Sequence, residues 1–187
     1  MHITSALRSL SLAVCLTTLF ATAHAAPLKT DTAKSSVLIT FKQLNVPVDA
    51  TFKSFDARID FDATKPALGK ASIDINIASF DLGEAEYNKE VMKKDWFNTA
   101  QFPKANFISS SIKPSTPGKF DVTGKLTIKG KTSEVHFPLT VNKTGANQVF
   151  DGTLPIKRLT YNIGEGEWKD TGMVADEVLI KFHIVAQ

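Results

Sequence analysis

The chain has 187 residues, a formal net charge of +3 and one cysteine. This length predicts one domain that can bury a substantial core. The lysines are scattered singly along the chain, without the basic block interleaved with aromatic residues that nucleic-acid-binding proteins carry, so we expect no nucleic-acid partner.

The first 25 residues have the pattern of a secretory signal peptide. Arg8 is their only charged side chain, and it precedes the apolar run LSLAVCLTTLFA and the small-residue motif AHA, which ends at Ala25. The run is shorter than the about 20 residues that span a bilayer, so we expect export and cleavage after Ala25. A buried N-terminal helix and a lipid anchor at Cys15 are the less favoured alternatives, the latter because Val14 is larger than the residue that lipoprotein processing prefers.

Cleavage removes the chemistry that cysteine could supply. It leaves no cysteine, and it leaves 21 lysines and arginines against 19 aspartates and glutamates. A disulfide, a thiolate nucleophile and a cysteine-ligated metal are then excluded. The remaining histidines, His136 and His183, lie on different predicted strands, so we expect no tightly bound transition metal and no cofactor.

From residue 37 onward, apolar residues alternate with polar ones, as in antiparallel strands with one dry and one solvated face. In the stretch KFDVTGKLTI, for example, Phe120, Val122, Leu126 and Ile128 share one face. Glycine, proline and asparagine mark turns between the alternating runs. The predicted strands are eight in number: 37–41, 46–61, 71–78, 104–113, 119–128, 134–141, 148–159 and 174–185.

Eight antiparallel strands are compatible with a sandwich or an up-and-down barrel. Several of the strands have about 10 residues and would be roughly 33 Å long. An eight-stranded barrel encloses space for side chains or for one small ligand. Long strands would make that space a tube, which suits a long apolar chain better than a compact metabolite.

Residues 84–94 interrupt the alternation with good helix formers. Asp81 begins a sequence typical of a capping box, and we therefore expect Asp81 to be the N-cap of one short helix that covers one end of the barrel. Trp96, Phe97 and Phe102 follow this helix. We expect these aromatic side chains to line the barrel mouth.

Three segments resemble the YceI-like family. DWFNTAQFPKANF (95–107) is similar to that family's aromatic-proline segment, GKLTIKGKTSEVHFPL (124–139) to its hairpin motif, and NIGEGEWKDTGMVADEVLIKF (162–182) to the end of one subgroup. The resemblance implies a secreted or periplasmic protein with a lipocalin-like antiparallel barrel. It also implies an elongated apolar cavity for polyisoprenoids or other long-chain amphiphiles. Glu90 stands where many members carry a histidine, so a head-group contact by that histidine is not transferable.

The candidate ligand-binding residues are aromatic or apolar side chains expected in the barrel interior or at its mouth. Trp96, Phe97, Phe102 and Trp168 have particular weight, because they lie in or beside predicted loops, where core filling explains them less well. The full set is Phe41, Phe52, Tyr87, Val91, Trp96, Phe97, Phe102, Phe107, Phe120, Phe137, Trp168 and Met173.

Together these features favour a periplasmic carrier that holds an isoprenoid quinone, a polyprenyl lipid or a fatty-acid-like lipid. Two alternatives stay open. One is a barrel filled by its own side chains that serves as an interaction module, and the other is an enzyme acting on such a lipid, for which no nucleophile–base pair can be assembled. Transient contact with a membrane or a membrane redox protein is compatible with a carrier, and both a monomer and a homodimer are compatible with the strands.

Overall fold

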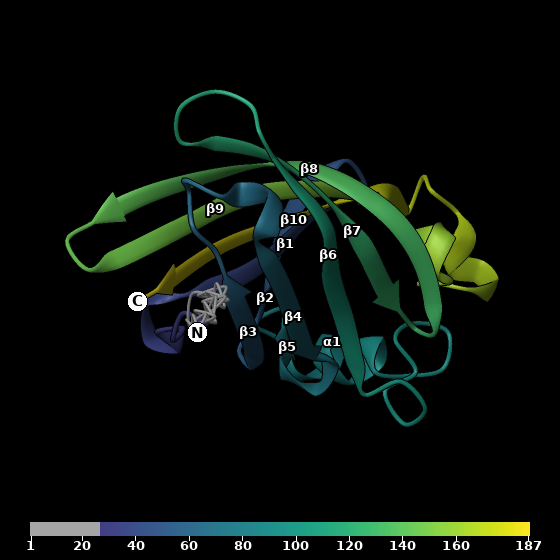
Figure 1. The fold of residues 1–187 in the computed structure, drawn as a ribbon. Helices are drawn as coiled ribbons and strands as arrows, with labels where there is room; N and C mark the ends of the chain where they lie inside the picture. The colour runs from purple at the N-terminus through teal and green to yellow at the C-terminus, as the bar shows by residue number, and fades with distance from the viewer. Residues whose placement is uncertain (1–26) are drawn as a thin grey trace, which may run out of the picture.

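The computed structural model describes residues 27–187, so the predicted signal peptide at 1–25 lies outside the described part of the chain. The described strands form one antiparallel sheet that curls strongly around an apolar interior, in the order β3-β4-β6-β7-β8-β9-β10-β1-β2-β5 (Figure 1). The strands are β1 (Ser36–Gln43), β2 (Val46–Phe52), β3 (Phe55–Asp60), β4 (Lys70–Asn76), β5 (Phe80–Asp81), β6 (Lys104–Pro114), β7 (Lys119–Ile128), β8 (Lys131–Thr144), β9 (Asn147–Lys157) and β10 (Val174–Ala186). The expected all-β, lipocalin-like architecture is therefore confirmed at this level.

The expected number of eight strands is wrong, because the sheet has ten. The predicted strand 46–61 is broken into β2 and β3 at Lys53 and Ser54, two consecutive polar residues at which the apolar positions of the pattern shift from even numbers, up to Phe52, to odd numbers, from Phe55. The backbone groups of these two residues bond outside the ladder: Lys53 N–H donates to the Ser79 carbonyl at 3.1 Å, and Asn76 N–H donates to the Ser54 carbonyl at 3.0 Å. The two-residue strand β5, which pairs with the end of β2, is the other addition.

The segment before β1 bonds to an outer strand of the sheet, β3, and to an inner strand, β10. Leu28 N–H donates to the carbonyl of Ile59 in β3 at 2.7 Å, and Asp31 N–H donates to the carbonyl of Val185 in β10 at 2.8 Å. The segment 28–31 therefore bridges an edge strand and the end of β10. The bond from Leu28 occupies one carbonyl on the edge of β3, which would otherwise be open to pairing with another chain.

The one α-helix in residues 27–187 is α1 (Ala85–Val91), which confirms a short helix in the expected place. Its N-cap is Glu84 rather than Asp81, and no side chain caps it. Asp81 instead belongs to β5, where it pairs with Lys53 and accepts a hydrogen bond from Asn88 Nδ2 at 2.8 Å. The contacts with Lys53 and Asn88 hold the pKa of Asp81 far below its ordinary value. The capping-box prediction was wrong because Asp81 lies in β5, where its carboxylate pairs with Lys53.

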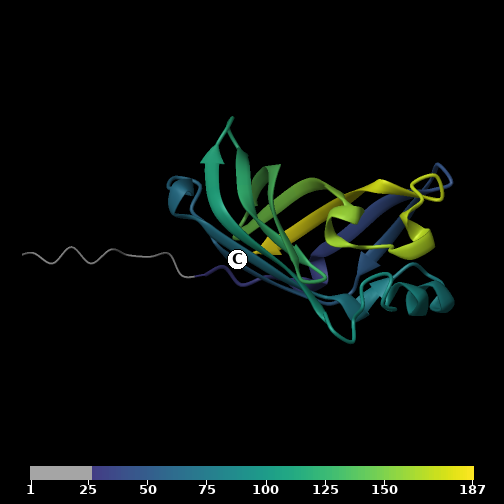
Figure 2. The same cartoon turned by 90° about the vertical axis from the view of Figure 1, so that its right-hand side faces the viewer.

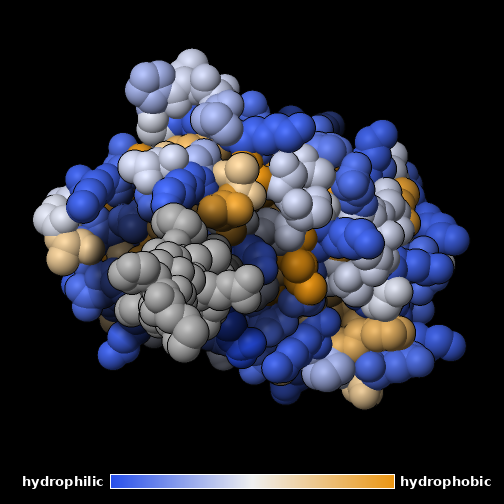
Figure 3. All heavy atoms as spheres, in the orientation of Figure 1, coloured by the Kyte–Doolittle hydropathy of each residue, from blue (hydrophilic) through white to orange (hydrophobic). Residues whose placement is uncertain are grey.

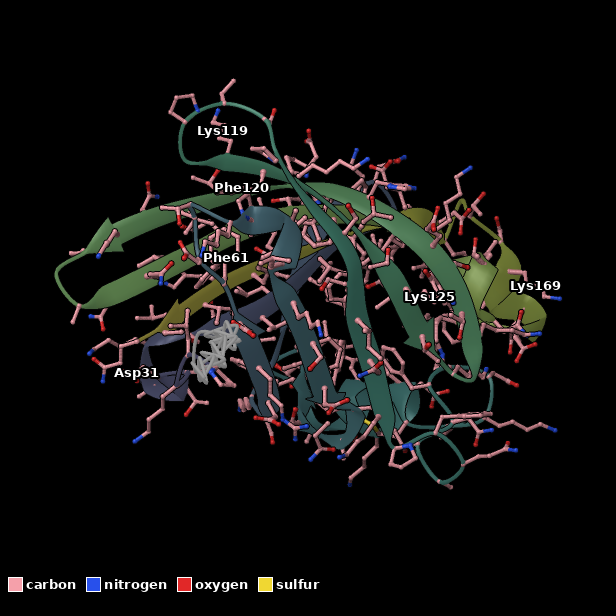
Figure 4. All side chains as sticks on the ribbon, in the orientation of Figure 1. Asp31, Phe61, Lys119, Phe120, Lys125 and Lys169 are labelled. Atoms are coloured by element: carbon pink, nitrogen blue, oxygen red, sulfur yellow. The ribbon has the colours of Figure 1, made fainter. Side chains whose placement is uncertain are left out.

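The two ends of the barrel differ. At one end Phe61 packs edge-on against Phe120 and Phe150, with ring centroids 5.0 and 5.6 Å apart. Figure 4 shows Phe61 and Phe120 in the half of the molecule that also contains Asp31, away from Lys169. These three aromatic side chains are all buried, so this end is filled.

The opposite end carries the irregular segments. The segment from Arg158 to Met173, with 3₁₀ turns at Arg158–Tyr161 and Gly166–Lys169, lies beside the turns that follow α1 (Figures 1 and 2). Both Gly164 N–H and Glu165 N–H donate to the Asp95 carbonyl at 2.8 Å. The outer surface is mostly hydrophilic on the face drawn in Figure 3, where hydrophobic residues form only small patches.

Candidate functional site

The curled sheet encloses an apolar cavity of about 240 Å³. Its walls are the inward-facing side chains of the strands, and it is lined from the filled end, at Phe61 and Phe150, to the irregular end, at Trp96 and Trp168. Gln43 and Tyr87 also line it, and both are exposed, which places the opening between the end of β1 and α1. The cavity is therefore a blind tube with a mouth at the irregular end.

Most of the predicted ligand-binding residues meet in this cavity. Its lining includes nine of them: Phe41, Phe52, Tyr87, Val91, Trp96, Phe97, Phe107, Phe137 and Trp168. They come from strands and loops that are far apart in the sequence. Their contact with a ligand stays a prediction.

Three predicted residues do not line the cavity. The Phe102 ring lies over the β7–β8 turn, where a Cβ added to Gly130 would be 2.8 Å from it, so its expected place in the mouth is wrong. Phe120 lies behind Phe61 in the aromatic cluster of the filled end. Met173 is exposed, and its carbonyl accepts a hydrogen bond from Leu44 N–H at 2.9 Å.

The residue set chosen from the sequence was also incomplete. It omitted many inward-facing aliphatic and aromatic side chains, although these residues lie on the apolar face that the alternating pattern predicts for each strand. Among the lining residues that were not selected are Val37, Ile39, Phe61, Ile73, Ile75, Phe150, Ile180, Phe182 and Ile184. One omission, Arg158, had no signal in the sequence.

Arg158 is a buried charge at the irregular end, only 2% exposed. Its guanidinium donates to the carbonyls of Ile163, Gly164, Trp168, Val174 and Ala175 at distances of 2.7–3.2 Å. Five bonds use all five donors of the side chain. Burial lowers the pKa of Arg158, and the charge of nearby Asp176 partly offsets this effect. The side chain stays a cation, and it ties the segment 158–173 to the start of β10.

Trp96 lies next to this charge. Its ring centroid is 5.3 Å from that of Trp168 and 5.9 Å from Arg158 Cζ, a distance compatible with a cation–π contact. The indole Nε1 of Trp96 is shielded from solvent and has no hydrogen-bond partner among residues 27–187. Such an unpaired buried donor is unusual.

Few other polar side chains line the cavity. They are Gln43, Tyr87, Glu90 and Asn106. Glu90 pairs with Lys93, and Asn106 donates to Asp74 Oδ1 at 2.7 Å. The cavity is thus almost free of groups that could act on a substrate or hold a metal.

His136, His183 and Glu165 do not line the cavity and bond to other side chains. His183 Nδ1 lies 2.6 Å from Asp151 Oδ1, and His136 Nδ1 lies 2.9 Å from the Thr123 hydroxyl. Both histidines are exposed. Glu165 forms an ion pair with the buried Lys129 at 2.8 Å. Within the described residues, no three histidine, cysteine or acidic side chains are close enough to hold a metal ion.

A curled antiparallel sheet around a blind apolar tube defines a lipocalin-like fold. The model of the YceI-like domain family matches residues 28–186, and the chain belongs to this family. None of the helices in residues 27–187 has both the length and the hydrophobicity needed to cross a bilayer.

Solved structures and curated proteins resemble the chain to different degrees. BcnA of Burkholderia cenocepacia is 54% identical, with a TM-score of 0.83 over 85% of this chain and 100% of its own. A polyisoprenoid-binding domain from Saccharophagus degradans, implicated in plant cell wall breakdown, has a TM-score of 0.69 over 88% of this chain and 99% of its own, at 18% identity, and shows the fold alone. A UPF0312 protein of Pseudomonas putida is 37% identical over 52% of this chain, and the match spans about half (51%) of that protein's length.

Proposed function

We propose that this protein is a periplasmic carrier that holds one long-chain amphiphile, such as an isoprenoid quinone or a polyprenyl lipid, in its cavity. The observation that carries the proposal is the blind cavity of about 240 Å³, whose lining is apolar apart from five side chains. Burial of an apolar chain in such a cavity is favourable by about 0.8 kcal/mol for each methylene group. The resemblance in fold to a polyisoprenoid-binding domain supports the choice of ligand class.

The cavity volume limits the ligand. An apolar cavity of about 150 Å³ in another protein holds one benzene molecule, so about 240 Å³ accepts on the order of ten carbon atoms of a chain. A longer polyprenyl chain would extend beyond the mouth.

The predicted signal peptide supports the periplasmic location, and cleavage after Ala25 is part of the proposal. The side chains that line the cavity favour binding over catalysis, because no nucleophile among them is paired with a base. The presence of an open cavity favours the carrier over a barrel filled by its own side chains. We further propose that loading and release involve transient contact with a membrane or a membrane redox protein.

Blocking the cavity tests the proposal. Ala105 is buried and faces the cavity from β6, whereas Ile108 on the same strand is 55% exposed. We expect Ala105→Trp to fill the tube and to weaken the binding of a tritiated farnesyl lipid at least tenfold. Overpacking costs about 1–3 kcal/mol, which a stability of about 5–15 kcal/mol tolerates.

The control variant is Ile108→Trp, which adds the same side chain to the outer face and should leave binding unchanged. Equilibrium dialysis gives the affinity, and circular dichroism verifies the fold. Equal binding by the wild type and by folded Ala105→Trp would contradict a ligand site in the cavity.

A further inference from the structure

Exposed apolar side chains gather around the mouth of the cavity. Among residues 27–187, six large hydrophobic side chains are exposed, and four of them belong to the irregular end: Leu44, Val46, Tyr87 and Met173. Leu44 and Val46 lie in and beside the turn between β1 and β2, and the Leu44 N–H donates to the Met173 carbonyl at 2.9 Å. Figure 2 shows this turn, the segment 158–173 and α1 at the same end of the molecule, on the right. We call these four residues the apolar rim.

The apolar rim continues the lining of the cavity. Tyr87 is exposed and is itself part of that lining. Val46 and Phe52 are both at even positions of β2, so they share one face of the strand, and Phe52 lines the cavity. Gln43, another lining residue, directly precedes Leu44. An apolar chain that leaves the cavity therefore meets apolar side chains at the mouth.

Leu44 has a backbone conformation that leucine rarely adopts. Its φ is +49°, and that of Asn45 is +65°. Hairpin turns with two such residues strongly favour asparagine, aspartate or glycine. Packing does not explain the leucine, because it is 67% exposed. A side chain that strains the backbone and is not buried in the fold indicates a contact outside the fold.

The charges near the apolar rim favour a neutral partner. The segments 42–46, 84–95 and 165–173 together carry five lysines and seven acidic side chains. Attraction to an anionic surface requires an excess of lysine and arginine, which these segments lack. Apolar side chains can enter the interface of a bilayer without such attraction, because the contact removes them from water.

The size of the cavity favours a bilayer as that partner. The cavity accepts on the order of ten carbon atoms, so part of a longer lipid stays outside it. A mouth that rests on a bilayer would leave this part among the lipid chains rather than in water.

We propose that the apolar rim docks the mouth of the cavity on the surface of an uncharged lipid bilayer, with the Leu44 side chain inserted into the interface. The ligand then passes between bilayer and cavity without crossing water. This inference rests on the proposed carrier function and adds the surface and the partner of the membrane contact: the bilayer itself rather than a membrane protein.

A substitution at Leu44 separates docking from folding. Leu44→Asn removes the apolar side chain, and asparagine tolerates a positive φ better than leucine does, so the variant should be at least as stable as the wild type in thermal unfolding. Its binding to sucrose-loaded phosphatidylcholine vesicles, measured by sedimentation, should be about tenfold weaker, as expected for the loss of one buried leucine side chain.

The matched control is Leu68→Asn. Leu68 is 72% exposed and lies beside the filled end, where a Cβ added to the next residue, Gly69, would be 3.1 Å from the Phe61 ring. This variant should bind vesicles as the wild type does. Equal vesicle binding by wild type and Leu44→Asn overturns the inference, as does wild-type binding that requires anionic phosphatidylglycerol. A wild-type dimer that Leu44→Asn dissociates in analytical ultracentrifugation would assign the apolar rim to a second copy of the chain and would also overturn it.

Lipid uptake distinguishes docking from the carrier function. In equilibrium dialysis, tritiated farnesol should bind the wild type and Leu44→Asn with equal affinity, because Leu44 does not line the cavity. Uptake of farnesol from phosphatidylcholine vesicles should be about tenfold slower in Leu44→Asn, in proportion to its weaker docking. Equal uptake rates overturn the docking inference and leave the carrier function standing. Absence of farnesol binding in both proteins rejects the carrier function and, with it, the role of docking.

Discussion

At the scale of single residues, Arg158 shows what the sequence could not predict. It follows Lys157 at the end of a strand-like run, and nothing in this order distinguishes it from the solvated lysines of other strands. Its burial depends on the segment 158–173 and on the start of β10, whose carbonyls point towards the guanidinium. Trp96 and Trp168, by contrast, could be selected from the sequence, because aromatic side chains in predicted loops are poorly explained by core packing.

Removal of the Arg158 guanidinium should destabilise the fold strongly. Arg158→Met leaves five carbonyls, three in the segment 163–168 and two at the start of β10, without their donor. Because a buried acceptor left unpaired costs about 1–3 kcal/mol, we expect the free energy of unfolding to fall by about 3 kcal/mol or more. Urea denaturation measures this loss. Arg58→Met is the matched control, because Arg58 is exposed and pairs at 2.8 Å with exposed Asp56; it should cost less than about 1 kcal/mol. Equal losses in the two variants would contradict the structural role of Arg158.

The Glu165–Lys129 pair predicts a pH dependence. The bond to Lys129 holds the pKa of Glu165 below its ordinary value of 4.5 in the folded protein. A carboxylate with a lowered folded pKa stabilises the fold above its unfolded pKa, and this contribution is lost as the pH falls through the folded value.

Glu165→Gln should therefore reduce the free energy of unfolding at neutral pH, and the difference from the wild type should shrink below pH 4.5. Urea denaturation at several pH values measures it. Glu167→Gln, at an exposed neighbour, is the control. A difference between Glu165→Gln and the wild type that does not change with pH would contradict the role of this pair.

At the scale of secondary-structure elements, the alternating pattern located the long strands well, since one face of each is buried. The break at Lys53–Ser54 was missed although two consecutive polar residues shift the alternation there; the hydrogen bonds to Ser79 and Asn76 that fix the break come from residues distant in the sequence. The same reason explains the missed strand β5 and the misassigned N-cap Asp81. Local patterns specify which face is apolar, whereas the ends of elements depend on distant partners.

Glycines inside strands provide a further test at this scale. A Cβ at Gly152 in β9 would lie 2.2 Å from the ring of Phe182, a residue of β10 that lines the cavity. Gly152→Ala should force this ring to move and should destabilise the protein by about 1–3 kcal/mol through overpacking.

Thermal unfolding followed by circular dichroism measures the effect. Gly172→Ala, in an exposed loop with its nearest contact at the flexible Asp170 side chain, should change the stability by less than about 0.5 kcal/mol. A Gly152→Ala protein as stable as the wild type would show that the ring of Phe182 is not held over this glycine.

At the scale of the whole molecule, the account depends on an apolar interior that the chain does not fill. The sequence indicated this interior through long alternating strands and through the resemblance to the YceI-like family. It could not indicate that the Phe61, Phe120 and Phe150 rings fill one end, or that the mouth lies between β1 and α1. Those features arise from side chains that meet only when the sheet curls.

The most direct test of a lipid carrier is the content of the cavity. The protein should be purified without detergent from a bacterium that expresses it, extracted with organic solvent and analysed by mass spectrometry, with Ala105→Trp as the blocked control. The account predicts one class of long-chain lipid at about one molecule per chain in the wild type and a strongly reduced amount in the blocked variant. An extract free of long-chain lipid, or equal amounts of lipid from both proteins, would contradict it.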